Sequence, residues 1–276
     1  MTIQILLPEG FTAQHRSLVL AYVRGKEAIP GANWPRLMEA FDLLHNAVVM
    51  IGRERHAFPA IYRRSVEDRY AARFIEQLYI LFDVEKESVH LRAAVSRAIT
   101  HSLPKAGYYR LGIPESRLLL AYILYWWNSW SKGYALEVYV YRDLAKAGIR
   151  FRAHDLRSPV GRFSPYDLEV LGFQGDVKTS TYFLWATRTR GLEQDFYISR
   201  LYIPRQRAGT LVTFLKSGMW EEIDGQTLVV ALEQAVEVFP AVARVTHRGV
   251  ELVVVDYEVW KGKVLIKQQE AAYGND

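Results

Sequence analysis

The sequence contains no cysteine among its 276 residues. This absence excludes disulfide bonds, zinc sites with cysteine ligands, iron–sulfur clusters and catalysis by a thiol. It also fits a reducing compartment. The N-terminus, MTIQILLPEGF, lacks the basic start and the apolar run of a signal peptide, so we expect a cytoplasmic protein.

Long hydrophobic runs and several catalytic motifs are missing as well. The longest apolar run, Leu118–Trp127, has ten residues. A membrane span takes about 20, so we expect a buried helix there and no membrane partner. The sequence has no P-loop, no G-x-S-x-G turn, no H-E-x-x-H motif and no cluster among its seven histidines. Nucleotide binding by a P-loop and the esterase and zinc-protease chemistry of those motifs are therefore excluded.

The composition is that of a folded, slightly basic protein. Hydrophobic residues make up 50% and charged residues 24% of the chain, which argues against disorder. The formal net charge is +5, and the basic residues comprise 25 Arg and 10 Lys. Arginine binds phosphate through two parallel hydrogen bonds and stacks on bases, so its excess favours a nucleic-acid partner. A GC-rich gene also raises the arginine content, and the composition leaves both explanations open.

The spacing of apolar residues divides the chain into two regions. In the first half they recur at helical spacing, as Tyr70, Phe74 and Leu78 do. Alternating patterns and turn residues in the second half predict strands. We therefore expect an α/β protein with a helical N-terminal region, residues 1–130, and an α/β domain, residues 131–276.

The expected helices of the first half cover residues 12–28, 34–54, 61–82, 85–103 and 114–130. A further helix over 132–147 precedes strands at 149–154, 165–171, 176–181, 196–203 and 209–214. Beyond them we expect a helix at 226–238 and hairpins at 243–255 and 257–266, the second turning at Lys261–Gly262.

The segment 164–180, SPYDLEVLGFQGDVKTS, predicts a β-hairpin whose turn is permitted by Gly172 and Gly175. Along its second strand, alternation places Asp176 and Lys178 on one face and directs Val177 the other way, into a core. Pairing across the hairpin can then bring a carboxylate of the first strand beside this pair.

That carboxylate is Asp167, which pairing places beside Asp176. Two carboxylates at one place repel each other and require a cation between them. A few hard oxygen ligands suit Mg²⁺, which polarises a phosphate and lowers the pKa of bound water. A lysine beside them can stabilise the charge of the transition state. The pattern therefore predicts a site that hydrolyses phosphodiester bonds.

Asp167, followed on the next strand by the D-x-K triplet 176–178, resembles the core of the PD-(D/E)xK nuclease superfamily, which has the restriction-endonuclease-like fold. That core begins with a helix bearing a glutamate, then a strand and the motif hairpin, in a central mixed sheet. Glu137 lies in the corresponding helix. The motif proline is Pro165, one residue early, and the resemblance covers roughly residues 131–240.

The resemblance implies a Mg²⁺-dependent deoxyribonuclease, an endonuclease that cuts DNA, with Mn²⁺ able to replace Mg²⁺. It implies that Asp167 and Asp176 bind the metal together with the Val177 carbonyl. Glu137 would bind a second metal or a bridging water, and Lys178 would position the nucleophile. A homodimer is the expected arrangement where both strands are cut.

Four arginines flank the predicted site and are candidate phosphate contacts, with ordinary solvated side chains as the other interpretation. They are Arg150, Arg152, Arg157 and Arg162.

Two alternatives to the nuclease stay open. Asp167 and Glu169 could form the solvated face of an ordinary edge strand, paired with Lys178 across the hairpin. The chain could also retain the nuclease fold as a nucleic-acid-binding or scaffold protein that cuts nothing.

Overall fold

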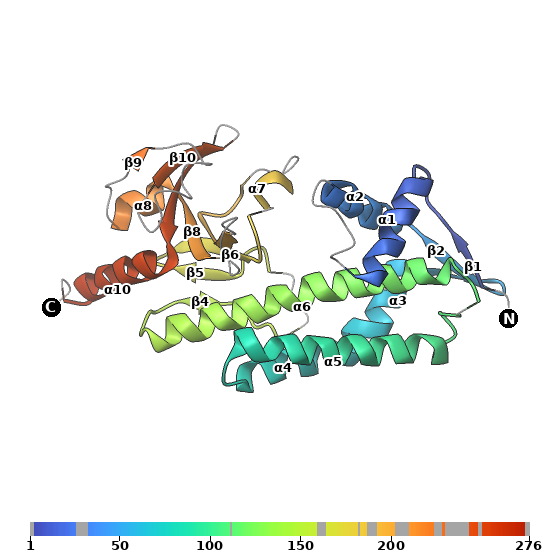
Figure 1. The fold of residues 1–276 in the computed structure, drawn as a ribbon. Helices are drawn as coiled ribbons and strands as arrows, with labels where there is room; N and C mark the ends of the chain where they lie inside the picture. The colour runs from blue at the N-terminus through green and yellow to red at the C-terminus, as the bar shows by residue number, and fades with distance from the viewer. Residues whose placement is uncertain are drawn as a thin grey trace. The chain divides into compact units, whose positions relative to one another are not determined.

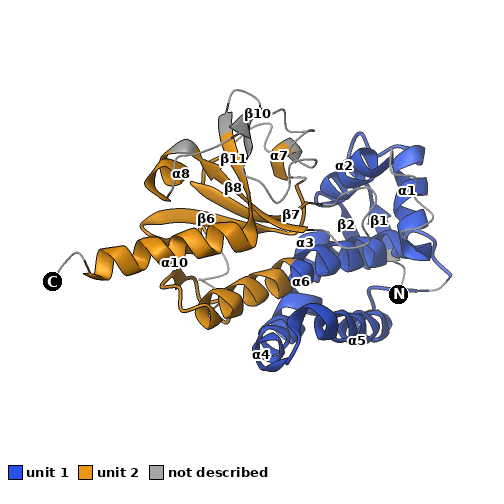
Figure 2. Cartoon of the chain, turned by 60° about the vertical axis from the view of Figure 1, so that its left-hand side comes forward, with its two compact units in different colours: residues 1–132 blue, residues 133–276 orange. Residues whose placement is uncertain are grey.

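The computed structural model describes residues 3–25, 33–110, 112–158, 164–181, 183–186, 192–201, 210–223, 228–229, 243–247 and 250–273. The chain divides into two compact units, residues 1–132 and 133–276 (Figure 2). Helix α6 (Ser116–Lys146) is 31 residues long and contributes to both. The sequence predicts two separate helices here, over residues 114–130 and 132–147, on either side of Ser131. That is wrong, because the Ser131 side chain is fully buried without a hydrogen-bond partner in the described chain.

The N-terminal unit opens with a small antiparallel sheet of the order β1-β2-β3 and two helices. Its elements are β1 (Ile3–Leu6), α1 (Ala13–Arg24), α2 (Trp34–Leu44), β2 (Val48–Ile51) and β3 (Glu54–Ala57). The helix predicted over 34–54 is therefore wrong beyond Leu44. The run Val-Val-Met-Ile favours a strand, and Gly52 adopts the positive φ, 64°, of a tight hairpin turn.

The rest of this unit is helical. Three helices follow one another without a break and replace the single helix predicted over 61–82, and a fourth precedes α6. They are α3 (Phe58–Tyr62), the π-helix η3 (Arg63–Ala71), α4 (Ala72–Ile80) and α5 (Val84–Lys105). The core of the unit is aromatic, since Trp127 is fully buried and the rings of Phe41 and Tyr125 stack with centroids 3.9 Å apart.

The C-terminal unit is built on one mixed sheet. Its described strands are β4 (Arg152–Ala153), β5 (Leu168–Val170), β6 (Phe173–Lys178), β7 (Phe196–Leu201), β8 (Thr210–Lys216), β9 (Leu228–Val229), β10 (Ala243–His247) and β11 (Val250–Asp256). Their order is β4-β5-β6-β7-β8-β11-β10-β9 (Figure 1). β6 is parallel to β7, and β9 to β10, whereas the other neighbours are antiparallel. The predicted α/β fold with a mixed sheet is confirmed.

Helices α7 (Phe183–Ala186), α8 (Ser217–Ile223) and α10 (Tyr257–Tyr273) belong to the same unit. The hairpin predicted over 243–255 is confirmed as β10–β11, but the one over 257–266 is wrong, because α10 occupies that segment. Asp256 caps the helix, since its Oδ1 accepts a hydrogen bond from the backbone N–H of Glu258 at 2.9 Å. Trp260 and Val264, four residues apart, are both buried as one helical face.

Two further expectations concern the rest of the chain. Most of the helix predicted over 226–238 lies outside the described residues, and Leu228 and Val229 form strand β9 instead. Among the described helices, none combines the length and apolar character that a membrane crossing takes.

The side chain of Gln268, on α10, pairs with the backbone of Arg150 just before β4. The Arg150 N–H donates to Gln268 Oε1 at 2.8 Å, and Gln268 Nε2 donates to the Arg150 carbonyl at 2.6 Å. The Arg150 guanidinium also donates to the backbone carbonyl of Gln268 at 3.1 Å. Gln268 is buried, so α10 holds the segment that leads into the sheet.

The β5–β6 hairpin is formed as predicted, with its turn at Leu171 and Gly172, whose φ angles are 53° and 84°. The expectation that Gly175 permits the turn is wrong, because this residue lies inside β6 opposite Leu168. A Cβ at position 175 would overlap the ring of Phe196 on β7. Glycine is therefore required where the two parallel strands meet, one residue before Asp176.

We predict that Gly175→Ala lowers the free energy of unfolding by about 1–3 kcal/mol, the usual cost of overpacking, as measured by urea denaturation. Gly262→Ala, in α10, is the matched control. A Cβ there meets nothing within 4 Å and should stabilise the helix by about 1 kcal/mol. Adding Phe196→Leu should recover part of the loss. An unchanged stability of Gly175→Ala would show that the ring tolerates a side chain.

Candidate functional site

Helix α6 carries Glu137 into the interior of the C-terminal unit. Its neighbours Leu136 and Val138 are buried, and Glu137 itself is only 8% exposed. It lies on the helix that precedes the first strand of the sheet, where the sequence places it. Burial raises the pKa of its carboxyl, because the charged form loses its water.

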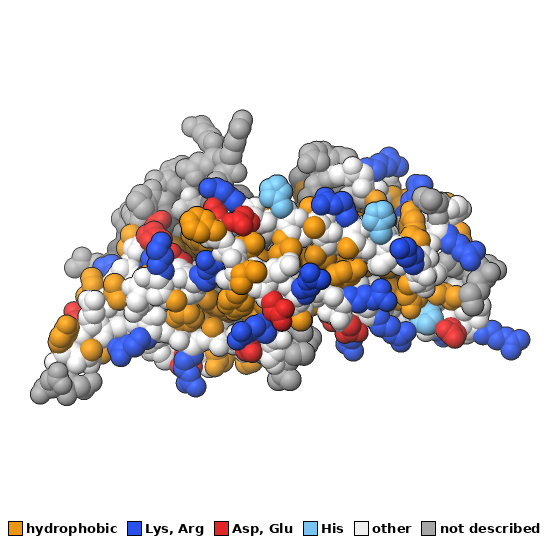
Figure 3. Space-filling view, turned by 90° about the horizontal axis from the view of Figure 1, so that it is seen from below, with side chains coloured by type: hydrophobic (Ala, Val, Ile, Leu, Met, Phe, Trp, Pro, Cys, Tyr) orange, Lys and Arg blue, Asp and Glu red, His pale blue; other side chains and the backbone are white. Residues whose placement is uncertain are grey.

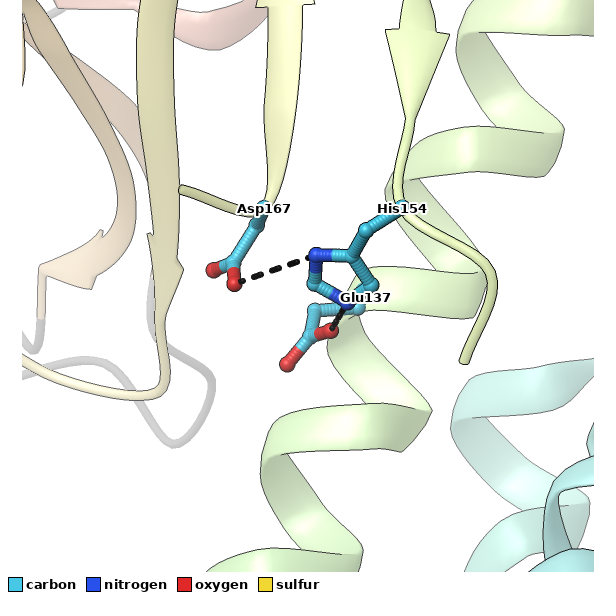
Figure 4. Close-up of side chains that lie close together, drawn as sticks. All are labelled: Glu137, His154 and Asp167. Atoms are coloured by element: carbon cyan, nitrogen blue, oxygen red, sulfur yellow. Dashed lines mark ion pairs between the residues drawn. The ribbon is translucent and has the colours of Figure 1, made fainter. Parts of the chain in front are cut away.

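His154 follows β4 and points toward Glu137 (Figure 4). Its Nδ1 is 3.0 Å from the carbonyl oxygen of Tyr166, and its Nε2 is 3.4 Å from Glu137 Oε2. Since a carbonyl only accepts, we assign the ring hydrogen to Nδ1. In the neutral ring, Nε2 then presents a lone pair to a carboxylate oxygen, so a proton or another cation is needed between them.

The pKa of His154 reflects the same contact. Burial alone would lower it, but the Glu137 carboxylate and the Tyr166 carbonyl outweigh burial and raise it. The carboxylate of Asp167 adds to this effect. In the absence of a metal, this pocket therefore favours a protonated histidine.

Asp167 precedes β5 and completes the cluster. Its Oδ2 accepts a hydrogen bond from the backbone N–H of Val177 at 2.7 Å, and its Oδ1 lies 3.9 Å from His154 Nδ1. Its own N–H donates to the carbonyl of Gly175 at 2.9 Å, which fixes the backbone. Burial and then the negative charge of Glu137 raise the pKa of Asp167 to about 7. Near neutral pH, this carboxyl is divided between its charged and protonated forms.

Asp176 and Lys178 lie beside the cluster on β6, with Lys178 Nζ 2.8 Å from Asp176 Oδ2. Val177, between them, is 4% exposed and points to the opposite face, which confirms the predicted alternation. The hairpin register continues with Asp167 opposite Asp176. Burial would lower the pKa of Lys178, but the surrounding carboxylates, Asp176 foremost, outweigh it and raise the pKa.

Glu137, His154 and Asp167 together offer a donor set that fits a metal ion. One ligand atom of each lies within 4.8 Å of the other two. Glu137 Oε2 and His154 Nε2 are buried and have no hydrogen-bond partner in the described part of the chain. Two carboxylates suit Mg²⁺ or Mn²⁺, and an imidazole favours the transition metal. Ligating histidines usually donate their other N–H to an acceptor, as His154 does to the Tyr166 carbonyl.

Sequence reasoning missed His154 and named Asp176 as a metal ligand. His154 ends the strand predicted over 149–154, and no spacing motif marks it. One signal was present, because it stands between the helix glutamate and the hairpin aspartate. Asp176 lies outside the three-residue cluster, with its carboxylate paired to Lys178. Its role as a ligand, with that of the Val177 carbonyl, stays a prediction.

Three of the four arginines predicted to contact phosphate are described, and Arg162 lies outside the described residues. All three are exposed, and each contacts a partner within the C-terminal unit. The contacts are Arg150 Nη2 to the Gln268 carbonyl at 3.1 Å, Arg152 Nη1 to Glu169 Oε1 at 3.6 Å, and Arg157 Nε to Asp155 Oδ1 at 3.1 Å.

The elements around the cluster follow the order α6-β4-β5-β6-α7-β7, with an antiparallel β4-β5-β6 meander and a parallel β7. No family model, curated protein or solved structure matches this chain. The donor atoms and their arrangement are therefore the basis for assigning a function.

We predict that Asp167→Asn stabilises the metal-free protein, and more at pH 8 than at pH 5. The raised pKa means that folding favours the protonated form, so wild-type stability falls as the pH rises from about 4 toward 7. Asparagine keeps an acceptor for the Val177 N–H but carries no charge. The measurement is the melting temperature in excess chelator at both pH values.

The control is Asp155→Asn, an exposed aspartate whose pKa is lowered by hydrogen bonds from the backbone and side chain of Arg157. This variant should show no gain at pH 8. An equal effect of Asp167→Asn at both pH values would contradict the burial of an ionised Asp167.

Proposed function

We propose that this protein is a metal-dependent endonuclease that hydrolyses phosphodiester bonds of DNA. The observation that carries the proposal is the buried set of Glu137, His154 and Asp167, beside the Asp176–Lys178 pair on the next strand. Two of these carboxyl groups, Glu137 and Asp167, have raised pKa values in the absence of a cation. A divalent metal would favour their charged forms and so stabilise the site.

Glu137, His154 and Asp167 would hold the metal, with Asp176 and the Val177 carbonyl as further predicted ligands. Mg²⁺ or Mn²⁺ bound there would polarise a phosphoryl oxygen and lower the pKa of a bound water. The imidazole ligand favours Mn²⁺ over Mg²⁺ in affinity, since nitrogen donors suit transition metals better.

The protein's own groups would orient the reactants. The Tyr166 carbonyl holds the His154 ring with Nε2 facing the cluster. The carboxylate of Asp176 holds the ammonium of Lys178 at 2.8 Å, so this cation is positioned before substrate arrives. Lys178 would orient the attacking water and stabilise the extra negative charge on the phosphate in the transition state.

The order of the elements supports the resemblance to PD-(D/E)xK nucleases. A helix that bears Glu137 is followed by β4, the motif hairpin β5–β6, the short helix α7 and β7. The resemblance implies the first part of this order, namely a helix with a glutamate, a strand and the motif hairpin. The restriction-endonuclease-like core accordingly belongs to this proposal. In the described chain Glu169 pairs with Arg152 and Lys178 pairs with Asp176, whereas the solvated-hairpin alternative pairs Lys178 with Asp167 and Glu169.

We predict that the protein cuts DNA with Mg²⁺ or Mn²⁺ and stops when a chelator is added. His154→Asn should weaken Mn²⁺ binding at least about tenfold, as measured by calorimetry, because one of three donors is lost. His101→Asn, an exposed histidine on α5, should bind Mn²⁺ as the wild type does. Full cleavage in excess chelator, or unaltered Mn²⁺ affinity of His154→Asn, would contradict the proposed site.

Lys178→Ala should slow single-turnover cleavage by a factor of about 10² to 10³, because one preorganised contact to the transition state is removed. DNA binding in Ca²⁺ should persist, since the metal ligands remain. Lys267→Ala, which removes a surface pair with Glu222, is the control and should cut at the wild-type rate. If Lys178→Ala also cuts at that rate, the lysine has no catalytic role. A wild-type protein that binds DNA but never cuts it would favour the scaffold alternative.

A further inference from the structure

The positive charge of the chain belongs to its N-terminal unit. Residues 1–132 contain 17 Lys and Arg against 12 Asp and Glu, whereas residues 133–276 contain 18 of each. The net charge of +5 is therefore that of the first unit alone. On the face of the molecule drawn in Figure 3, blue Lys and Arg side chains are spread more widely than red acidic ones.

Three of these charges form what we name the arginine stripe, consisting of Arg64 and Arg69 on η3 and Arg73 on α4. All three side chains are exposed. The opposite side of the same two helices is buried and includes Val66 and Phe74. The inward face thus packs in the core of the N-terminal unit, and the stripe is left to solvent.

The π-winding of η3 aligns the stripe. In an α-helix, residues five apart lie about 140° apart around the axis. A π-helix, with its i→i+5 hydrogen bonds, has more residues per turn, so Arg64 and Arg69 lie closer to one side of the helix than they would in an α-helix. Arg73 follows four residues after Arg69, about 40° further around in α-helical geometry. π-helical stretches are rare and occur frequently at functional sites.

The arginine stripe has no hydrogen-bond or ion-pair partner among the described residues. Within the described chain, none of its three guanidiniums forms a hydrogen bond or ion pair, whereas the adjacent Arg63 pairs with Glu67 at 3.9 Å. The other acidic residues of the two helices, Asp68 and Glu76, are exposed and do not pair with it. Like charges along one helix face destabilise it, so the stripe favours an anionic partner.

We propose that the arginine stripe binds the sugar–phosphate backbone of double-stranded DNA. This inference rests on the proposed nuclease function, because it gives the N-terminal unit the task of holding the substrate. Each planar guanidinium can bind a phosphate through two hydrogen bonds. Residues four apart in an α-helix are about 6 Å apart along the axis, and one DNA strand carries a phosphate about every 3.4 Å of duplex axis on a backbone that winds around it. Neighbouring phosphates are therefore farther apart than this rise, and successive arginines can reach neighbouring phosphates of one strand.

An anionic membrane surface is the competing partner, because Ile80 and Phe82 at the end of α4 are 81% and 96% exposed. A helix that lies on a membrane inserts a continuous apolar face. In α4 that face, with Phe74, Ile75 and Leu78, is buried in the core of the unit. The observations therefore favour DNA.

The test compares three variants of the full chain in excess chelator, where no cutting occurs. The first is Arg64→Gln, Arg69→Gln and Arg73→Gln together. The second replaces the same three arginines by lysine. The charge-matched control is Arg24→Gln, Arg36→Gln and Arg97→Gln, three exposed arginines on α1, α2 and α5. Binding of a fluorescent DNA duplex is followed by anisotropy at several salt concentrations, and binding of phosphatidylserine vesicles by sedimentation.

The glutamine variant should bind DNA about tenfold or more weakly, and the slope of log K against log salt should fall by about 2.7, or about 0.9 per lost phosphate contact. The lysine variant should keep the wild-type slope, which shows that the glutamine variant failed through charge and not misfolding. The control should keep most of its slope.

Equal slopes for the glutamine variant and the wild type would overturn the inference. So would a loss of vesicle binding with DNA binding intact. The nuclease proposal has a separate readout, because binding is measured without turnover. If the wild type binds DNA through the stripe but never cuts it, the nuclease proposal is contradicted and the proposal for the stripe stands.

Discussion

The contact between Glu137 and His154 is the constraint on which the site depends. Two buried acceptors, Glu137 Oε2 and the unprotonated Nε2 of His154, lie 3.4 Å apart. The other ring nitrogen of His154, Nδ1, already donates to the Tyr166 carbonyl. Such a contact is stable only with a positive charge between or on the two groups. A proton satisfies it at low pH, and a divalent cation does so over a wider pH range. The contact therefore fits either a protonated histidine or the bound metal of the proposed function.

The carboxylates of the site are neutralised in two different ways. Asp176 has a fixed cation, the ammonium of Lys178, carried on the same strand face. Among the described residues, Glu137 and Asp167 have no Lys or Arg paired with them, only His154, and burial raises the pKa of both carboxyl groups. The charge of Asp176 is thus compensated within the chain, whereas Glu137 and Asp167 are the carboxyl groups that a bound cation would affect most.

The local pattern of the hairpin was predictable, whereas the burial around it was not. Alternation along β6 and the register of the two strands follow from the period of a strand, so the places of Asp176, Val177 and Lys178 could be read from the sequence. His154 could not, because its role arises from three segments that meet only in the fold. The errors at Ser131 and in α10 have a common cause: a polar or glycine residue looked like a boundary, while the buried helical face continued through it.

The pairing of Gln268 with Arg150 has a consequence for which elements complete the C-terminal unit. The primary amide of Gln268 meets both the N–H and the carbonyl of one backbone residue, as a neighbouring strand would. It thereby serves as a one-residue substitute for a sheet partner at the approach to β4. The nuclease resemblance stops near residue 240, yet the group that secures the entrance to the first strand comes from the last helix. The last helix of the chain therefore contacts the segment before the first strand of the sheet, and α10 is part of the structure that supports β4.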